Sequence, residues 1–447
     1  MPLPGEAGRG PAGRIRRVLM AAAGLGLGVD GTAAQSAADS VAATTAVAEL
    51  VAACRADGGR LWGQTLCGPL IAVDGLSGFG VATEPPPAGR FRPIGDLWVG
   101  RVPSGMQVAN TTIEWQGRTW ATVRLPVPAD RFLRIQLFVH EAFHRIQPAL
   151  GLGARDAINP HLDERDGRYL LRLELRALAK AVATPDRDGE ARKAARDAIL
   201  FRLARHRRYP GADTLEALLE IQEGLPEYAG ARLSLAATGL GPERLAEAAE
   251  AFDMRPSYVR ALGYGTGPLL GTLLDRWAPG WRSRIRAGGF ASQLAAAVGF
   301  VAPAGLDAAA AARAPSYGGD ALAKIEDERA SARAERLAGY RATLVTGPVV
   351  ALVSDQMMRS FDPNTLIPLG DEGTVYPTGQ FEAPWGTLSV ERGGALVTNQ
   401  SVRVPAPAAV DTLVSVLTTD GYRLELKPGW RLGAGPRLGD WIVRRVP

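Results

Sequence analysis

The chain has 447 residues, of which 46% are hydrophobic and 22% are charged, and its net charge is +5. This composition is typical of a soluble globular protein of one to three domains, and it excludes a wholly disordered or collagen-like chain. The 51 basic residues include four lysines, and the arginines are mixed with acidic residues throughout. The sequence therefore lacks the single-sign basic patch that is typical of nucleic-acid binding.

The first 34 residues have the three parts of an export signal. Arginines precede an apolar run over residues 18–29, and small residues at 32–34 offer a cleavage site. The apolar run is too short to span a bilayer comfortably, and its glycines disfavour the alternative of an uncleaved anchor. We therefore expect a periplasmic or secreted bacterial protein that has no stable membrane span once residues 1–34 are removed.

Residues 35–130 predict a helix followed by a small antiparallel sheet. Residues 40–56 have helical spacing without glycine or proline, and residues 70–74 predict a buried strand. Further strands are expected where apolar and polar residues alternate, at 97–102, 111–115 and 120–125. Cys54 and Cys67 are the two cysteines of the chain, and in an oxidising compartment they can form one disulfide. We favour this disulfide over two buried free thiols.

The middle region, residues 131–345, is predicted to be helical. Asp130 can cap a helix over residues 131–146, where apolar residues recur at helical spacing. Further helices are expected at 163–184, 188–207, 213–235, 242–252, 258–277 and 319–343. Residues 301–318 predict a loose connector. From residue 346 the pattern changes to short strands with glycine and proline turns, which predicts a β-rich C-terminal domain over 346–447 and an α+β fold class.

The most informative residues are His140, Glu141 and His144, which occur in the sequence His-Glu-Ala-Phe-His. Two histidines four residues apart lie one turn apart on the same face of a helix, so their imidazoles can bind one metal ion. Glu141 projects beside that ion, where it can take a proton from a bound water. The alternative is a pair of histidines that only pack in a buried helix.

A catalytic zinc site needs a third protein ligand in addition to water. A carboxylate is a better candidate than the two remaining histidines. His161 follows a proline in a predicted loop, and His206 lies in a strongly basic run that disfavours a divalent cation. The segment 220–228, Glu-Ile-Gln-Glu-Gly-Leu-Pro-Glu-Tyr, is the most prominent source of such a carboxylate.

The motif at 140–144, together with this segment, resembles the gluzincin metallopeptidases, which comprise the thermolysin-like proteases and the zinc aminopeptidases. In the aminopeptidase branch the third ligand is the glutamate of a Glu-Gly-x-Ala-x-Tyr pattern. The resemblance implies that Glu223 is the third zinc ligand and Tyr228 the terminal aromatic residue of the pattern. Pro226 departs from the pattern, which has alanine there, and the interval between the motif and Glu223 is longer than in those families.

Two other glutamates remain candidates for the third ligand. Glu174 lies on a predicted helix, although Arg172 and Arg176 beside it make an ordinary helix ion pair the simpler interpretation. Glu174 could also orient a ligating histidine. Glu227 is the remaining candidate.

The resemblance implies a zincin-like catalytic region, in which an antiparallel sheet lies over the motif helix and its edge strand binds extended substrate. It also implies a Zn²⁺-dependent hydrolysis of peptide bonds in which Glu141 is the general base. Tyr264, in a glycine-rich turn, is expected to stabilise the oxyanion, and the alternative is a tyrosine that packs at a helix start.

The expected partner is a peptide or protein substrate. The sequence leaves open which substrate this is, and whether cleavage is of the endopeptidase or the exopeptidase type. A second hypothesis is a non-proteolytic or inactive zincin-like envelope or binding protein. In that case the β-rich C-terminal domain, rather than the metal motif, would mediate the interaction with the partner.

Overall fold

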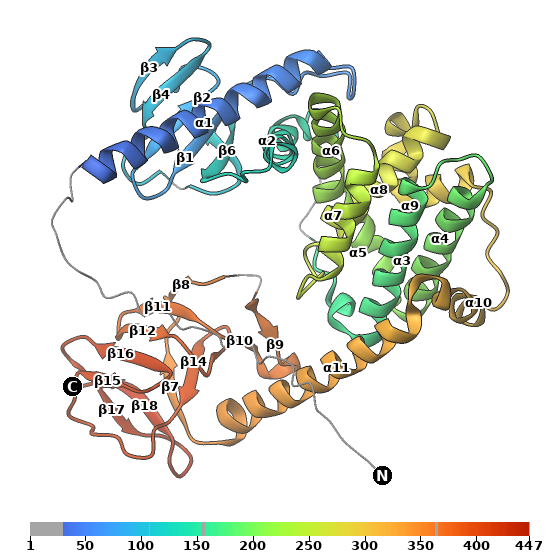
Figure 1. Cartoon of the computed structure of the whole chain (residues 1–447). Coiled ribbons are helices and arrows are strands. Elements are labelled where there is room, and N and C mark those ends of the chain that lie inside the picture. The colour runs from blue at the N-terminus through green and yellow to red at the C-terminus, as the bar shows by residue number, and fades with distance from the viewer. Residues whose placement is uncertain (1–29, 107, 154–156, 363–364, 447) are drawn as a thin grey trace, which may run out of the picture.

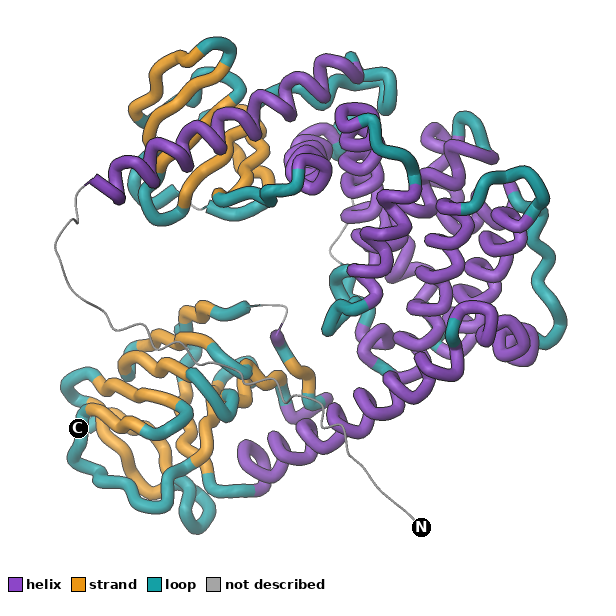
Figure 2. The backbone as a smooth tube through the Cα atoms, viewed as in Figure 1, coloured by secondary structure: helices purple, strands orange, loops and turns teal. Residues whose placement is uncertain are grey.

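The computed structural model describes residues 30–446 except 107, 154–156 and 363–364. Most of the expected export signal, residues 1–29, lies outside the described residues. Among the described helices, none combines the length and the apolar character that a membrane span requires. The chain forms an N-terminal sheet, a helical body and a C-terminal group of strands, joined in that order (Figures 1 and 2).

The N-terminal unit contains one long helix and a six-stranded sheet. Its elements are α1 (Asp30–Asp57), β1 (Leu70–Asp74), β2 (Phe79–Ala82), β3 (Arg90–Ile94), β4 (Leu97–Arg101), β5 (Thr111–Trp115) and β6 (Arg118–Leu125). The strand order is β3-β4-β2-β1-β6-β5. The predicted antiparallel sheet is therefore wrong in one respect, since β1 pairs with β6 in parallel. The chain crosses from β4 near one edge to β5 at the other edge, and this crossing brings β6 alongside β1 in the same direction.

One face of this sheet packs against helices. Leu70, Ala72 and Val81 belong to the core that the sheet shares with α1 and with α2 (Arg131–Ile146). Ile71 and Val73, which alternate with them along β1, belong to a separate cluster on the opposite face. This packing fixes α2 against the part of the sheet formed by β5 and β6.

The helical body follows α2. Its helices are α3 (Arg165–Ala183), α4 (Glu190–Arg208), α5 (Ala212–Leu219), α6 (Leu225–Thr238), α7 (Glu243–Asp253), α8 (Leu262–Trp277), α9 (Trp281–Ala297), α10 (Leu306–Arg313) and α11 (Gly319–Arg341). The helix predicted at 213–235 is interrupted by a π-helical turn at Glu220–Gly224. The connector predicted at 301–318 contains α10 and a 3-10 turn, and α9 was not predicted from the sequence.

The C-terminal part consists of two sheets. Its strands are β7 (Val349–Val353), β8 (Met358–Ser360), β9 (Ile367–Pro368), β10 (Thr374–Tyr376), β11 (Gly379–Ala383), β12 (Gly386–Val390), β13 (Ala395–Val397), β14 (Ser401–Pro405), β15 (Val416–Thr418), β16 (Tyr422–Leu426), β17 (Trp430–Ala434) and β18 (Trp441–Arg445). A seven-stranded sheet, β17-β18-β7-β14-β13-β10-β9, accompanies a five-stranded one, β15-β16-β12-β11-β8. Buried residues of both sheets, such as Val402 and Leu424, form one shared core. The long helix α11 leads from the helical body to these sheets (Figure 1).

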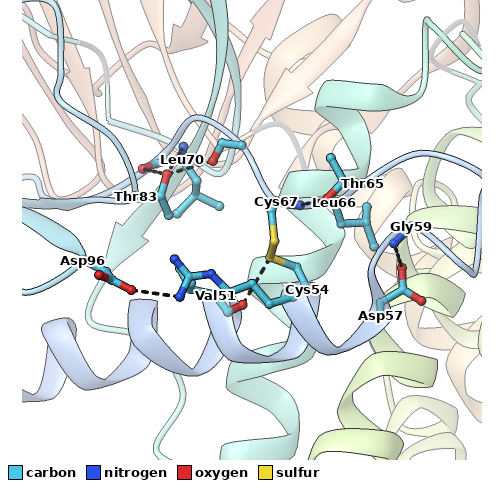
Figure 3. Close-up of a disulfide and its surroundings, with 12 residues drawn as sticks. Val51, Cys54, Asp57, Gly59, Thr65, Leu66, Cys67, Leu70, Thr83 and Asp96 are labelled. Atoms are coloured by element: carbon cyan, nitrogen blue, oxygen red, sulfur yellow. Dashed lines mark hydrogen bonds and ion pairs between the residues drawn. A yellow bond between two sulfur atoms is a disulfide. The ribbon is translucent and has the colours of Figure 1, made fainter.

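The predicted disulfide is confirmed. Cys54 in the last turns of α1 is bonded to Cys67, just before β1, with 5.4 Å between their Cα atoms (Figure 3). The backbone carbonyl of Cys67 accepts a hydrogen bond of 3.0 Å from Arg145 of α2. In the same loop, the ring of Trp62 packs edge-on against Phe143, with 5.0 Å between ring centroids. The disulfide loop therefore rests on the two residues that flank His144.

Candidate metal centre

The helix α2 presents both motif histidines on one face. Asp130 caps its first turn by accepting a hydrogen bond of 2.9 Å from the N–H of Leu133. Apolar residues at helical spacing, including Ile135, Val139 and Phe143, are fully buried in the core. The helix begins and ends at the predicted residues, and His140 and His144 follow each other by one turn.

The π turn at Glu220–Gly224 carries Glu223 to the histidines. This turn lies unusually close to the start of α8. A Cβ atom on Gly267 would lie 2.5 Å from Cα of Gly224, and one on Gly263 would lie 2.8 Å from the carbonyl oxygen of Leu219. Only glycine permits this approach of two backbones. The same approach brings Tyr264 of α8 to Glu223.

The ligand atoms of His140, His144 and Glu223 converge. The two Nε2 atoms are 3.1 Å apart, and Oε2 of Glu223 lies 3.3 Å from Nε2 of His140 and 3.7 Å from that of His144. Zinc bonds of about 2.0–2.2 Å in a tetrahedron place ligand atoms roughly 3.3–3.6 Å apart. The donor set and its spacing therefore fit a tetrahedral zinc ion. Among the described residues, no other group of His, Cys, Asp or Glu side chains meets the same criterion.

Each histidine is held through its other ring nitrogen. Nδ1 of His140 donates to Oε2 of Glu227 at 2.7 Å, and Gln136 donates to Oε1 of Glu227 at 2.7 Å. Nδ1 of His144 lies 2.9 Å from Oε1 of Gln147. These bonds leave both Nε2 atoms facing Glu223, the arrangement that metal-binding histidines require. Glu227 is therefore a partner of His140 rather than a ligand itself.

The charges of the site favour a bound cation. Burial lowers the pKa of His140, but hydrogen bonds to Glu223 and Glu227 raise it more, to about 10. Burial raises the pKa of Glu223, and hydrogen bonds from His140, His144 and Tyr264 outweigh this and hold it well below its usual range. Two carboxylates thus retain one positive charge on His140 when no metal is bound. A divalent cation bound to His140 would displace that proton and supply two positive charges in its place.

Glu141 lies in the wall of a cleft that opens onto the ligand atoms. The cleft has a volume of about 370 Å³ and is lined by Glu141, both histidines, Glu223 and Tyr264. Burial raises the pKa of the Glu141 carboxyl, while the neighbouring His140 and His144 act in the opposite direction. A carboxylate with a raised pKa is a better proton acceptor than an ordinary one.

The opposite wall of the cleft comes from the sheet. Thr111 and Thr112 of the edge strand β5 line it together with Asn110. Among the described strands β5 pairs with β6 alone, so its outer edge is available to a further strand. The edge strand β5 and the motif helix α2 therefore line the same cleft.

Tyr264 is part of the site and not only a packing residue. Its hydroxyl donates to Oε2 of Glu223 at 2.5 Å. Its ring stacks on that of His140, with 5.3 Å between centroids and 8° between planes. Burial, followed by the charge of Glu223, raises its pKa well above the usual value, so the phenol stays protonated and can donate.

Glu174 is not at the site, and its prediction as a rival ligand is wrong. Its carboxylate accepts a hydrogen bond of 2.7 Å from Arg202 and lies 2.8 Å from Arg205, with 1% of the side chain exposed. The predicted pairing of Glu174 with Arg172 and Arg176 is also wrong, because both arginines bind Asp253 instead. Residues two apart on a helix point to different sides, which is why these side chains do not meet.

The remaining candidates also lie elsewhere. His161 and His206 both bind Glu216, at 2.7 and 2.8 Å. Tyr228 donates to Asp275 at 2.8 Å and packs against Trp281 in the core. Sequence reasoning missed Gln136 and Gln147, although their spacing of four and three residues from the nearer histidine would have indicated them.

Comparisons with known proteins do not extend this geometric evidence. No family model matches the chain, and neither a curated protein nor a solved structure matches it.

Proposed function

We propose that this protein is an exported zinc metallopeptidase of gluzincin type with a zincin-like catalytic region. The observation that carries the proposal is the convergence of His140, His144 and Glu223 at tetrahedral spacing beside the buried carboxyl of Glu141. The disulfide supports export, because such bonds form and persist in oxidising compartments.

In this proposal His140, His144 and Glu223 hold the ion. A bound zinc ion would polarise the scissile carbonyl and stabilise the charge that develops on its oxygen. Glu141 accepts the proton of the attacking water and passes it to the leaving amine. Tyr264 donates a hydrogen bond to the developing oxyanion, for which its phenol must leave Glu223.

The cleft supports a peptide as the substrate. An extended peptide can add to the outer edge of β5 by main-chain hydrogen bonds, which places one of its carbonyls near the ligand atoms. Main-chain pairing of this kind requires no particular side chain. The substrate class is therefore an unfolded or flexible polypeptide segment.

The test separates metal binding from hydrolysis. Glu141→Gln is expected to keep one zinc ion per chain and to lose cleavage of an unstructured protein substrate such as casein. Glu223→Ala is expected to lose both. Glu250→Gln, an exposed glutamate on α7, is the matched control and should keep both. A wild type that binds zinc but cleaves nothing in a broad peptide library would instead favour a zincin-like binding protein.

A further inference from the structure

The backbone carbonyl of Ile221 does not have the partner it would have in an α-helix. There, the N–H of residue 225 would donate to it. Here the N–H of Leu225 donates to the carbonyl of Glu220, because the chain makes a π turn. A π-type partner for Ile221 would be the N–H of the next residue, but that residue is Pro226, which has none. The Ile221 carbonyl is thus left for a donor outside the helix.

That donor is Gln147, directly after α2. Its Nε2 donates to the carbonyl of Ile221 at 2.8 Å, and its Oε1 lies 2.9 Å from Nδ1 of His144. A backbone carbonyl only accepts, so the amide nitrogen faces Ile221 and the amide oxygen faces His144. Nδ1 of His144 therefore carries the hydrogen, and Nε2 keeps its lone pair for a metal. Gln147 is 3% exposed, so water does not readily replace either bond.

We propose that Pro226 and Gln147 are positioning residues of the metal centre. Pro226 leaves the Ile221 carbonyl free, and Gln147 connects that carbonyl to the ring of His144. The π turn then positions two of the proposed metal ligands. It carries Glu223 directly, and it orients the ring of His144 through Gln147. The inference rests on the proposed metal centre, and it gives a role to the residue at which this chain departs from the gluzincin pattern.

Replacement of Pro226 by alanine distinguishes this role from a purely structural one. Alanine restores an N–H that can pair with the carbonyl of Ile221 or Gln222 and so compete with Gln147. Alanine is the better helix former and restores a backbone donor, which offsets the packing lost with the buried ring of Pro226, so the melting temperature is expected to change little. Zinc affinity should fall while stability does not, and a residue that only supports the fold does not produce that combination.

The experiment measures the zinc dissociation constant of the full chain by competition with a chromophoric chelator. The test variants are Pro226→Ala and Gln147→Met. The controls are Pro242→Ala, at the start of α7, and Gln293→Met, a half-buried glutamine on α9. Both test variants are expected to bind zinc about tenfold more weakly, the low end of the range for residues that orient metal ligands, and both controls to match the wild type. Cobalt-substituted test variants should also show shifted visible absorption bands, which report ligand geometry.

Two outcomes separate this inference from the proposed function. If the wild type binds zinc and Gln147→Met has the same dissociation constant and cobalt spectrum, the positioning role is overturned and the metal centre stands. If the well-folded wild type binds no zinc even after supplementation, both are overturned. Neither the zinc dissociation constant nor the cobalt spectrum depends on peptide cleavage. The role of Gln147 can therefore be tested even if the wild type binds zinc but cleaves no peptide.

Discussion

The hydroxyl of Thr266 donates a hydrogen bond of 2.7 Å to Oε1 of Glu220. Thr266 is in the second turn of α8 and Glu220 is the first residue of the π turn, and both are buried. Arg202 of α4 donates two more hydrogen bonds to the same carboxylate, at 2.6 and 2.9 Å. Two helices, α8 and α4, therefore fix the residue from which the Glu223 turn begins.

This contact predicts different effects for two threonines of α8. Thr266→Val removes one partner of a buried carboxylate and is expected to lower the free energy of unfolding by about 1–3 kcal/mol. It should also weaken zinc binding, because Glu220 and the turn after it gain freedom. Thr272 is the matched control, since its buried hydroxyl has no hydrogen-bond partner among the residues that the structure describes. Thr272→Val is expected to be neutral or stabilising in urea denaturation.

The role of Thr266 would be contradicted if both valine variants had the same unfolding midpoint and the same zinc affinity. Thr266→Ser is the rescue variant. It keeps the hydroxyl that reaches Glu220 and should retain most of the zinc affinity of the wild type.

Replacement of Glu227 is predicted to weaken zinc binding less than replacement of Glu223. Glu227→Gln weakens the acceptor of His140 without removing a metal ligand, and the zinc dissociation constant is expected to rise by about 10- to 100-fold. Glu223→Gln removes the charge of a ligand and should cost more. Isothermal titration of zinc into the metal-free variants checks the order, with the exposed Glu250→Gln as reference. Equal losses at 223 and 227 would mean that the ligand assignment is wrong.

Local periodicity explains which parts of the site could be predicted. His140, Glu141 and His144 share one helix, and the helix follows from apolar spacing and the Asp130 cap within a short stretch of chain. Glu223 lies on a separate element, and spacing alone could not connect it to the histidines. The resemblance to gluzincins was needed to select it over Glu174.

Long-range pairing explains which parts could not be predicted. The parallel pairing of β1 with β6 depends on where the chain crosses the sheet, and no local pattern specifies that. The carboxylate of Glu174 forms buried ion pairs with arginines of α4. The residues next to Glu174 in the sequence do not indicate these pairs. The π turn left one trace in the sequence, the proline at 226, which stands out there only as a departure from the gluzincin pattern.

Acid is predicted to destabilise the metal-free protein partly through Asp253. Burial raises the pKa of this carboxyl, and hydrogen bonds from Arg172 and Arg176 outweigh this and lower it. A folded-state pKa below the unfolded value of about 3.9 stabilises the fold at pH values above the unfolded pKa. This stabilisation is lost as the pH falls through the folded pKa. The free energy of unfolding should therefore decrease below about pH 4.

The measurement is urea denaturation between pH 6 and pH 3 in the presence of a chelator, which removes any contribution from metal loss. Asp253→Asn should be less stable at pH 6 and should show a flatter decrease toward acid. Asp188→Asn, an exposed aspartate before α4, is the control and should follow the wild type. If the free energy of unfolding of Asp253→Asn fell with pH as steeply as that of the wild type, other carboxyl groups would account for the acid destabilisation.

The disulfide is predicted to stabilise both the fold and the metal helix. Cys54 and Cys67 are separated by 13 positions in the sequence, and replacing both with serine opens the loop between them. The free energy of unfolding is expected to fall by about 3 kcal/mol. The loop also contacts α2 through Arg145 and through Trp62 on Phe143. Arg145→Met, which keeps the bond but removes the guanidinium contacts, should therefore destabilise the protein less than the double serine variant. Urea denaturation under non-reducing conditions measures both. A double variant as stable as the wild type would mean that the contacts of Arg145 and Trp62 hold the loop on α2 without the disulfide.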